Sequence, residues 1–362
     1  MKILYAVQGT GNGHVCRARE IVPVLSRKAE VDVLISGIQS DVQLPFPAKY
    51  VFKGFSYIFG KKGGIDLLET YKKSRIKNLL TEIKHLPVEQ YDLVISDFEP
   101  VSSWACYLKN KPCIGLSHQA AVLNKKSPRP KHDDPIGRTV LKVYAPSSVQ
   151  YGFHFNSYNE NIFTPVIRKE IREMEVTDEG HYTVYLPAYS DKRLIDILSK
   201  CEDVQWEIFS KHFEKEIESD NIKIFPVNNE AFIQSLVSSH GVICGAGFET
   251  PAEALFLNKK LLVIPMKNQY EQHCNAAALQ QLGVPVLKSL KEKHLPLIQE
   301  WLENEERVDV NYPDSTEPII DHILKVHTVD AEYDRSSSNE NEFSAKAFKE
   351  LTIRRIISKL GG

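Results

Sequence analysis

A regular alternation of short apolar runs with longer amphipathic segments constrains the fold of this chain more than any other feature. In the first half, apolar runs occur at residues 3–7, 31–36, 50–55, 93–96 and 113–116. Segments with the apolar spacing of a helix separate them, at residues 15–27, 65–84 and 101–108. Strands that alternate with helices form parallel sheets with helices on both faces, so we predict an α/β fold.

The alternation is interrupted once and then starts again. Residues 156–180 are polar and irregular, and a second series of strands and helices follows from residue 183. At about 100–200 residues per domain, a chain of 362 residues is expected to form two domains. We therefore predict two doubly wound, Rossmann-like domains at residues 1–155 and 181–328, joined by a linker at 156–180. Ligands of such sheets bind at the carboxyl ends of the strands.

The last part of the chain has a different character. Residues 329–342 are rich in polar side chains and predict a flexible loop. Residues 343–362 regain helical apolar spacing and end in glycine, which predicts a C-terminal helix.

Composition narrows the classes of function. A formal net charge of -2 gives no indication of a nucleic-acid partner. The six cysteines are scattered without metal-site spacing, which is typical of buried thiols in a reducing compartment. The N-terminus does not resemble a signal peptide, and no apolar run approaches the ~20 residues that span a bilayer. We expect a cytoplasmic protein.

The loop after the first apolar run is rich in glycine and ends in a histidine. Its residues are Gly9, Thr10, Gly11, Asn12, Gly13 and His14. Glycines allow close approach of backbone to a ligand, and the start of the following helix attracts anions. The spacing differs from that of a dinucleotide fingerprint, and no acidic residue ends the second strand. His14 is either a general base, which its ordinary pKa would suit, or a residue that only caps the helix.

A second group of polar and glycine residues follows two strands of the second half. Residues 245–250 form a turn that opens a helix, where backbone N–H groups could hold a diphosphate. Glu253 could accept hydrogen bonds from both hydroxyls of a ribose, or could form a capping box with Thr250. Four polar side chains cluster at the start of the next helix and could contact sugar hydroxyls: Gln269, Glu271, Gln272 and Asn275.

These residues resemble the GT-B glycosyltransferases. The motif G-x-G-F-x-T-x-x-E-A-L, followed by L-V-I-P and E-Q-x-x-N-A, looks most like the UDP-glycosyltransferases and the peptidoglycan-pathway N-acetylglucosaminyltransferase. The loop G-T-G-N-G-H adds support, and the resemblance covers residues 1–155 and 180–325. It implies two Rossmann-like domains that face each other across a cleft, with the acceptor bound by the first and a UDP-sugar by the second.

The resemblance also implies a role for each site residue. His14 matches the family's base, and Asp97 matches the acid that orients it, although Asp97 could also be a strand-end residue that caps the next helix. Glu253 matches the ribose ligand, whereas Glu271 and Gln272 match the pair that contacts the donor sugar. Val227 and Asn228 lie where backbone holds the base. The diphosphate would meet Gly245, Ala246, Gly247, Phe248, Glu249 and Thr250. Gly11, Asn12 and Gly13 are the candidate site residues of the N-terminal loop. One departure is that no histidine precedes the glycine of the phosphate turn, where plant-type enzymes have one.

From these residues we predict direct displacement at the anomeric carbon. The chain has no D-x-D motif and no E-x7-E pattern in the donor region, which favours an inverting, metal-independent reaction without a cofactor. The transferred group would be a hexose or N-acetylhexosamine. Two alternatives remain open: a UDP-N-acetylglucosamine 2-epimerase of the same fold, and a non-catalytic protein that binds nucleotide sugars.

Basic and aromatic side chains interleave between Phe52 and Lys77, and a second basic cluster spans residues 125–131. One interpretation is peripheral contact with anionic lipid, which would suit a lipid-linked acceptor better than a soluble glycan. The other, which we favour, is a solvated loop and helix face.

Overall fold

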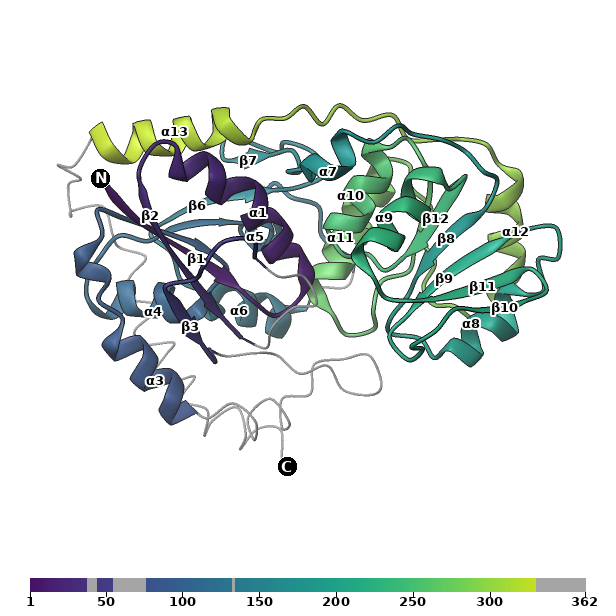
Figure 1. Cartoon of the computed structure of the whole chain (residues 1–362), viewed down its shortest axis with the longest axis horizontal. Helices are drawn as coiled ribbons and strands as arrows, with labels where there is room; N and C mark the ends of the chain where they lie inside the picture. Colours follow the sequence, from purple (N-terminus) through teal and green to yellow (C-terminus); the bar gives the residue numbers. More distant parts are fainter. Residues whose placement is uncertain (38–43, 55–75, 132–133, 330–362) are drawn as a thin grey trace.

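The computed structural model describes residues 1–37, 44–54, 76–131 and 134–329. Two β-sheets, each covered by helices, lie side by side in Figure 1. The first has the strand order β3-β2-β1-β4-β5-β6-β7, and the second has the order β10-β11-β9-β8-β12-β13. Neighbouring strands run parallel in both sheets except for β10 and β11. The predicted α/β class with two Rossmann-like halves is confirmed.

The strands of the first sheet are buried at the centre of the sheet and more exposed at its β3 edge. They are β1 (Lys2–Gln8), β2 (Glu30–Ser36), β3 (Tyr50–Phe52), β4 (Leu93–Asp97), β5 (Ile114–Ser117), β6 (Val149–Phe153) and β7 (Ile162–Phe163). In β1, Ile3, Tyr5 and Val7 pack into one core cluster, whereas Leu4 and Ala6 pack into another on the opposite face. Because successive side chains of a strand point to opposite faces, a continuous apolar run is what a sheet covered on both sides requires.

Helices cover both faces of this sheet. They are α1 (Asn12–Ser26), α3 (Ile76–His85), the short 3-10 helix η1 (Val88–Gln90), α4 (Pro100–Leu108), α5 (His118–Leu123) and α6 (Pro135–Tyr144). α4 begins where the side chain of Glu99 accepts hydrogen bonds from the N–H groups of Val101 and Ser102, with Pro100 at the first helical position. Part of the helix predicted at residues 65–84 lies outside the described residues. Most of the basic and aromatic segment between Phe52 and Lys77 also lies outside them.

The second sheet repeats this plan. Its strands are β8 (Tyr182–Tyr185), β9 (Trp206–Ser210), β10 (Ile217–Ser219), β11 (Ile222–Pro226), β12 (Gly241–Cys244) and β13 (Lys260–Val263). Its helices are α8 (Asp191–Leu198), α9 (Asn229–Ser238), α10 (Glu249–Phe256), α11 (Tyr270–Gln281), η2 (Glu292–His294) and α12 (Leu295–Glu303). All six cysteines of the chain are buried and free, as their spacing predicted.

Two elements lie elsewhere than the sequence indicated. β7 belongs to the first sheet although it falls within the predicted linker, and the short helix α7 (Lys169–Arg172) follows it. α13 (Thr316–Val329), expected in the second domain, lies along α1 of the first half (Figure 1). It buries Ile319, Ile320 and Ile323 in the same core cluster as α1, and apolar burial therefore decides its place.

The predicted flexible loop and C-terminal helix, at residues 329–342 and 343–362, lie almost wholly outside the described residues. Within the described part of the chain, no helix is both long and apolar enough to cross a bilayer.

Candidate active site

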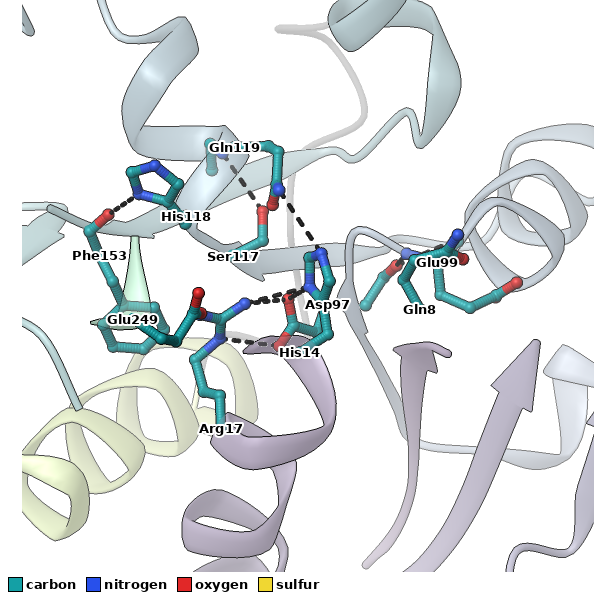
Figure 2. Close-up of polar contacts among 12 residues, drawn as sticks. Gln8, His14, Arg17, Asp97, Glu99, Ser117, His118, Gln119, Phe153 and Glu249 are labelled. Atoms are coloured by element: carbon teal, nitrogen blue, oxygen red, sulfur yellow. Dashed lines mark hydrogen bonds and ion pairs between the residues drawn. The ribbon is translucent and has the colours of Figure 1, made fainter. Parts of the chain in front are cut away.

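Two neighbouring strands bring the predicted base and its acid together. β1 and β4 are parallel neighbours, and Val7 pairs with Asp97 in their register. The chain leaves β1 through Gly11, whose φ of 92° suits glycine, and enters α1 with His14 in the first turn. His14 Nδ1 lies 2.8 Å from Asp97 Oδ1 (Figure 2). The fold thus joins two residues that are 83 positions apart in the sequence.

Arg17, one turn further along α1, forms a bidentate ion pair with Asp97. Its Nε donates to Oδ2 and its Nη2 to Oδ1, both at 2.8 Å. Burial acts to raise the pKa of Asp97, but the charges of Arg17 and His14 outweigh it and hold the pKa below its ordinary value. Asp97 is therefore ionised at neutral pH and can only accept hydrogen bonds.

The contacts of Nδ1 bear on the tautomer of His14. Asp97 Oδ1 can accept a hydrogen bond from Nδ1 at 2.8 Å, and Arg17 Nη2 lies 3.1 Å from the same nitrogen. With the proton on Nδ1, the ring has its lone pair at Nε2, as a general base requires. Gln119 Nε2 lies 3.5 Å from this atom and donates to Glu271 Oε2 at 3.1 Å. Gln119 therefore lies between His14, the predicted base in the first half, and Glu271, the residue of the second half that is predicted to contact the donor sugar.

Phe98 holds the backbone beside the base in an unusual conformation. Its φ of 55° is rare for a bulky side chain, and such strain concentrates at functional sites. The Phe98 ring lies parallel to the imidazole of His14, with centroids 6.3 Å apart, and stacks on Tyr144 at 4.7 Å. The strained residue thus forms an aromatic wall next to His14.

The turn between β12 and α10 lies against the first loop. α10 begins at Glu249 after Phe248, and no side chain caps it, so its N-terminus keeps its partial positive charge. A Cβ atom on Gly13 would lie 2.3 Å from Glu249 Oε2, so the glycine is what lets the two loops meet. Apart from the two neighbours of Gly247 in the chain, none of the described residues lies within 4 Å of the position that a Cβ atom on Gly247 would take, so that part of the turn is open among them.

Glu253 is paired within the protein. Its side chain is buried, and its two oxygens accept hydrogen bonds from Arg168 Nε at 2.6 Å and Nη2 at 2.9 Å. The capping-box alternative is wrong, because α10 begins before Thr250 and Glu253 points to Arg168 instead. The carboxylate that the resemblance assigns to a ribose therefore already has a bidentate partner.

The remaining donor candidates surround the same turn. Gln272 Oε1 accepts a hydrogen bond from the N–H of Met266 at 2.9 Å. The same oxygen lies 3.6 Å from the position that a Cβ atom on Gly245 would take. Gln269 caps α11, and Asn228 caps α9 directly after Val227. Asn275 is buried, and its Nδ2 donates to the carbonyl of Ala246 at 3.1 Å. The structure thus groups Gln272 and Asn275 with the turn, whereas Gln269 and Asn228 serve as helix caps.

The family of the chain follows from a comparison with known protein families. Residues 1–304 match the family model described as glycosyl transferase family 1. The chain belongs to this family. It is a glycosyltransferase, an enzyme that transfers a glycosyl group from a nucleotide sugar. A search of the curated proteins found no match.

Several solved structures have a similar fold. The MurG of Acinetobacter baumannii is 14% identical to this chain, with a TM-score of 0.53. The match covers 91% of this chain and 99% of the MurG chain. Arabidopsis thaliana UGT89C1 in complex with UDP is 12% identical with a TM-score of 0.54, covering 98% and 99%. The S. aureus MnaA-UDP structure is 11% identical with a TM-score of 0.58, covering 91% and 97%. At these identities the similarity is one of fold, and it confirms the predicted GT-B architecture.

Sequence reasoning missed three polar residues of this glycosyltransferase site. Arg17 lies three residues after His14, a spacing that puts both on one face of a helix, so it could have been found. Gln119 follows the end of β5, where ligand-binding residues gather, and this position was a usable signal. Arg168 comes from the predicted linker and is 85 positions away from Glu253, so no local pattern reveals it.

Two buried histidines, His118 and His154, bear on the pH dependence of stability in this glycosyltransferase. His118 Nδ1 donates to the carbonyl of Phe153, and its ring stacks on Phe248 of the second half at 3.9 Å. His154 Nδ1 accepts the N–H of Phe155, and within the described residues its buried Nε2 has no partner. Burial lowers the pKa of His118, and lowers that of His154 well below its ordinary value.

We expect the free energy of unfolding to fall as the pH is lowered from 7.5 to 5. Below the unfolded-state pKa of about 6.5, the unfolded chain binds protons at these positions that the folded chain does not. His154, whose pKa is lowered further, should account for the larger share of this loss. Urea unfolding at both pH values measures this, and His154→Gln should reduce the pH dependence. An unchanged dependence in that variant would show that His154 is protonated in the folded protein.

Proposed function

We propose that this glycosyltransferase transfers a hexose or N-acetylhexosamine from a UDP-sugar to an acceptor hydroxyl, with inversion at the anomeric carbon. The observation that carries the proposal is the His14–Asp97 pair, in which the carboxylate contacts Nδ1 and leaves Nε2 on the far side of the ring to act as the base. Glu271 of the second half lies one side chain, Gln119, away from that atom. The base of one half therefore reaches the region in which the other half would hold the donor sugar.

Direct displacement requires a base for the acceptor hydroxyl and positive charge for the leaving diphosphate. His14 removes the proton of the acceptor hydroxyl as the oxygen attacks the anomeric carbon, and the carbon–oxygen bond to the UDP diphosphate breaks. Asp97 and Arg17 fix the orientation of the ring, and Asp97 stabilises the imidazolium that forms. The uncapped start of α10 stabilises the charge that develops on the leaving diphosphate. Since the uncapped N-terminus of α10 supplies partial positive charge here, we propose that the reaction does not depend on a metal ion.

A thermal-shift panel of nucleotides and nucleotide sugars tests the donor. A ligand at ~100 times its dissociation constant should add roughly 2.7 kcal/mol of stability. We expect UDP and one UDP-sugar to raise the melting temperature equally with magnesium and with EDTA. A shift that requires magnesium would refute metal independence, and a shift only with other nucleotides would refute UDP.

The epimerase alternative makes a different prediction. An epimerase converts UDP-N-acetylglucosamine without any acceptor, whereas a transferase leaves the sugar of its donor unchanged until a hydroxyl attacks. Incubation with the UDP-sugar alone, followed by NMR of the sugar protons, separates the two. The family match favours transfer, and we expect no epimer to appear.

A further inference from the structure

Glu249 occupies an unusual place for a carboxylate in a donor site. It is the first residue of α10, at the turn where the diphosphate of the donor would bind. Its Oε1 accepts a hydrogen bond from Arg17 Nη1 at 2.9 Å, and this ion pair bridges the two halves of the protein (Figure 2). A carboxylate at this point would repel a diphosphate at close range.

The surroundings of this carboxylate are those of an anion site. It lies at the start of α10 and also against Gly13, the second residue of α1. The first turn of α1 has no acidic residue and no side-chain cap of its own. Two helix N-termini and a buried guanidinium therefore converge on the carboxylate, an arrangement that also attracts phosphate groups.

We propose that the Glu249 carboxylate occupies the place of a donor phosphate in the free protein. Glu249 must then move away from Arg17 when the nucleotide binds. Arg17 Nη1 then becomes a ligand of the donor diphosphate, and Glu249 sets the affinity for nucleotide by competing with it. This inference rests on the donor site of the proposed function. It assigns Arg17 a second role, because the same guanidinium orients Asp97.

Burial and charge decide which group moves. The side chains of Arg17 and Asp97 are 3% and 0% exposed, whereas that of Glu249 is 30% exposed and has solvent beside it. The carboxylates of Asp97 and Glu249 both pair with the single positive charge of Arg17, so an incoming diphosphate must compete with Glu249 for the guanidinium. The exposed carboxylate can turn into water, but the buried pair cannot.

Titration calorimetry with UDP alone tests the competition. Glu249→Gln keeps the shape of the side chain and removes its charge, so we expect UDP to bind roughly 3- to 30-fold more tightly than to the wild type. Glu300→Gln, on the exposed face of α12, makes the same change in net charge and should leave the affinity unchanged. Melting temperatures show that each variant is folded.

Unchanged or weaker binding of UDP by Glu249→Gln would overturn the inference. Equal tightening by Glu300→Gln would also overturn it, because the effect would then be one of net charge. If the wild type and both variants fail to bind UDP at all, the donor assignment fails instead, so the two failures are distinguishable.

A second variant tests the part played by Arg17. Arg17→Lys keeps the charge but loses the planar group that reaches Asp97 and Glu249 together. If Arg17 is the shared partner, Glu249→Gln should tighten UDP binding much less in the Arg17→Lys background than in the wild type. An equal gain in both backgrounds would show that Glu249 acts without Arg17 and would overturn its second role.

Discussion

Replacing His14 by alanine should lower turnover by roughly 10²–10⁴, the usual contribution of a positioned general base. The reason is geometric: His14 Nε2 is the basic nitrogen that the contact with Asp97 leaves unprotonated. Release of UDP from the UDP-sugar that the thermal-shift panel identifies measures turnover, with acceptors supplied in excess. Affinity for UDP should stay within about threefold of the wild type, because the imidazole acts on the acceptor side.

A matched control separates the base from a general effect of losing a histidine. His212 is exposed on a loop of the second half, and His212→Ala should leave turnover unchanged. Turnover of His14→Ala within about threefold of the wild type would remove His14 from the role of base. A loss of UDP affinity equal to the loss of turnover would instead mean that His14 supports the donor loop.

Replacing Glu253 by alanine should lower the free energy of unfolding by roughly 3–5 kcal/mol. Both oxygens of Glu253 pair with Arg168, whose side chain is only 8% exposed, so the variant leaves a buried guanidinium without its main partner. Burial raises the pKa of Glu253 although Arg168 acts to lower it, which shows how strongly the carboxylate is removed from water. Urea unfolding near neutral pH measures the loss.

The same position distinguishes the structural role from the ribose role that the resemblance implies. Glu300→Ala, an exposed carboxylate of α12, serves as the control and should change stability by less than about 0.5 kcal/mol. A Glu253→Ala protein with wild-type stability and weakened UDP binding would contradict the pairing with Arg168. It would identify Glu253 as a nucleotide ligand whose contact with Arg168 contributes little.

The fold could be predicted from the sequence because its central strands are buried on both faces. Residues 3–7 of β1 and the whole of β12 are apolar, and only a sheet with helices on both faces accommodates such strands. The position of α13 was not predictable in the same way. Its apolar face would suit either half, and long-range packing against α1 selects the first.

The site was predictable where function depends on a local motif. His14 and the turn at residues 245–250 stand at strand ends with glycines around them, which is a local signal. The ion pairs that organise the site are not local. Arg17 pairs with Glu249 across 232 positions, and Arg168 pairs with Glu253 across 85. Such pairs become visible only when the two sheets are placed against each other.

Hydrogen exchange with and without UDP tests the central claim most directly, namely that the β12–α10 turn holds the nucleotide opposite His14. We expect UDP to slow amide exchange at residues 245–250 and 269–275, and to leave peptides of α12 unchanged. Protection confined to other segments, or no protection at a UDP concentration that saturates binding, would contradict the account.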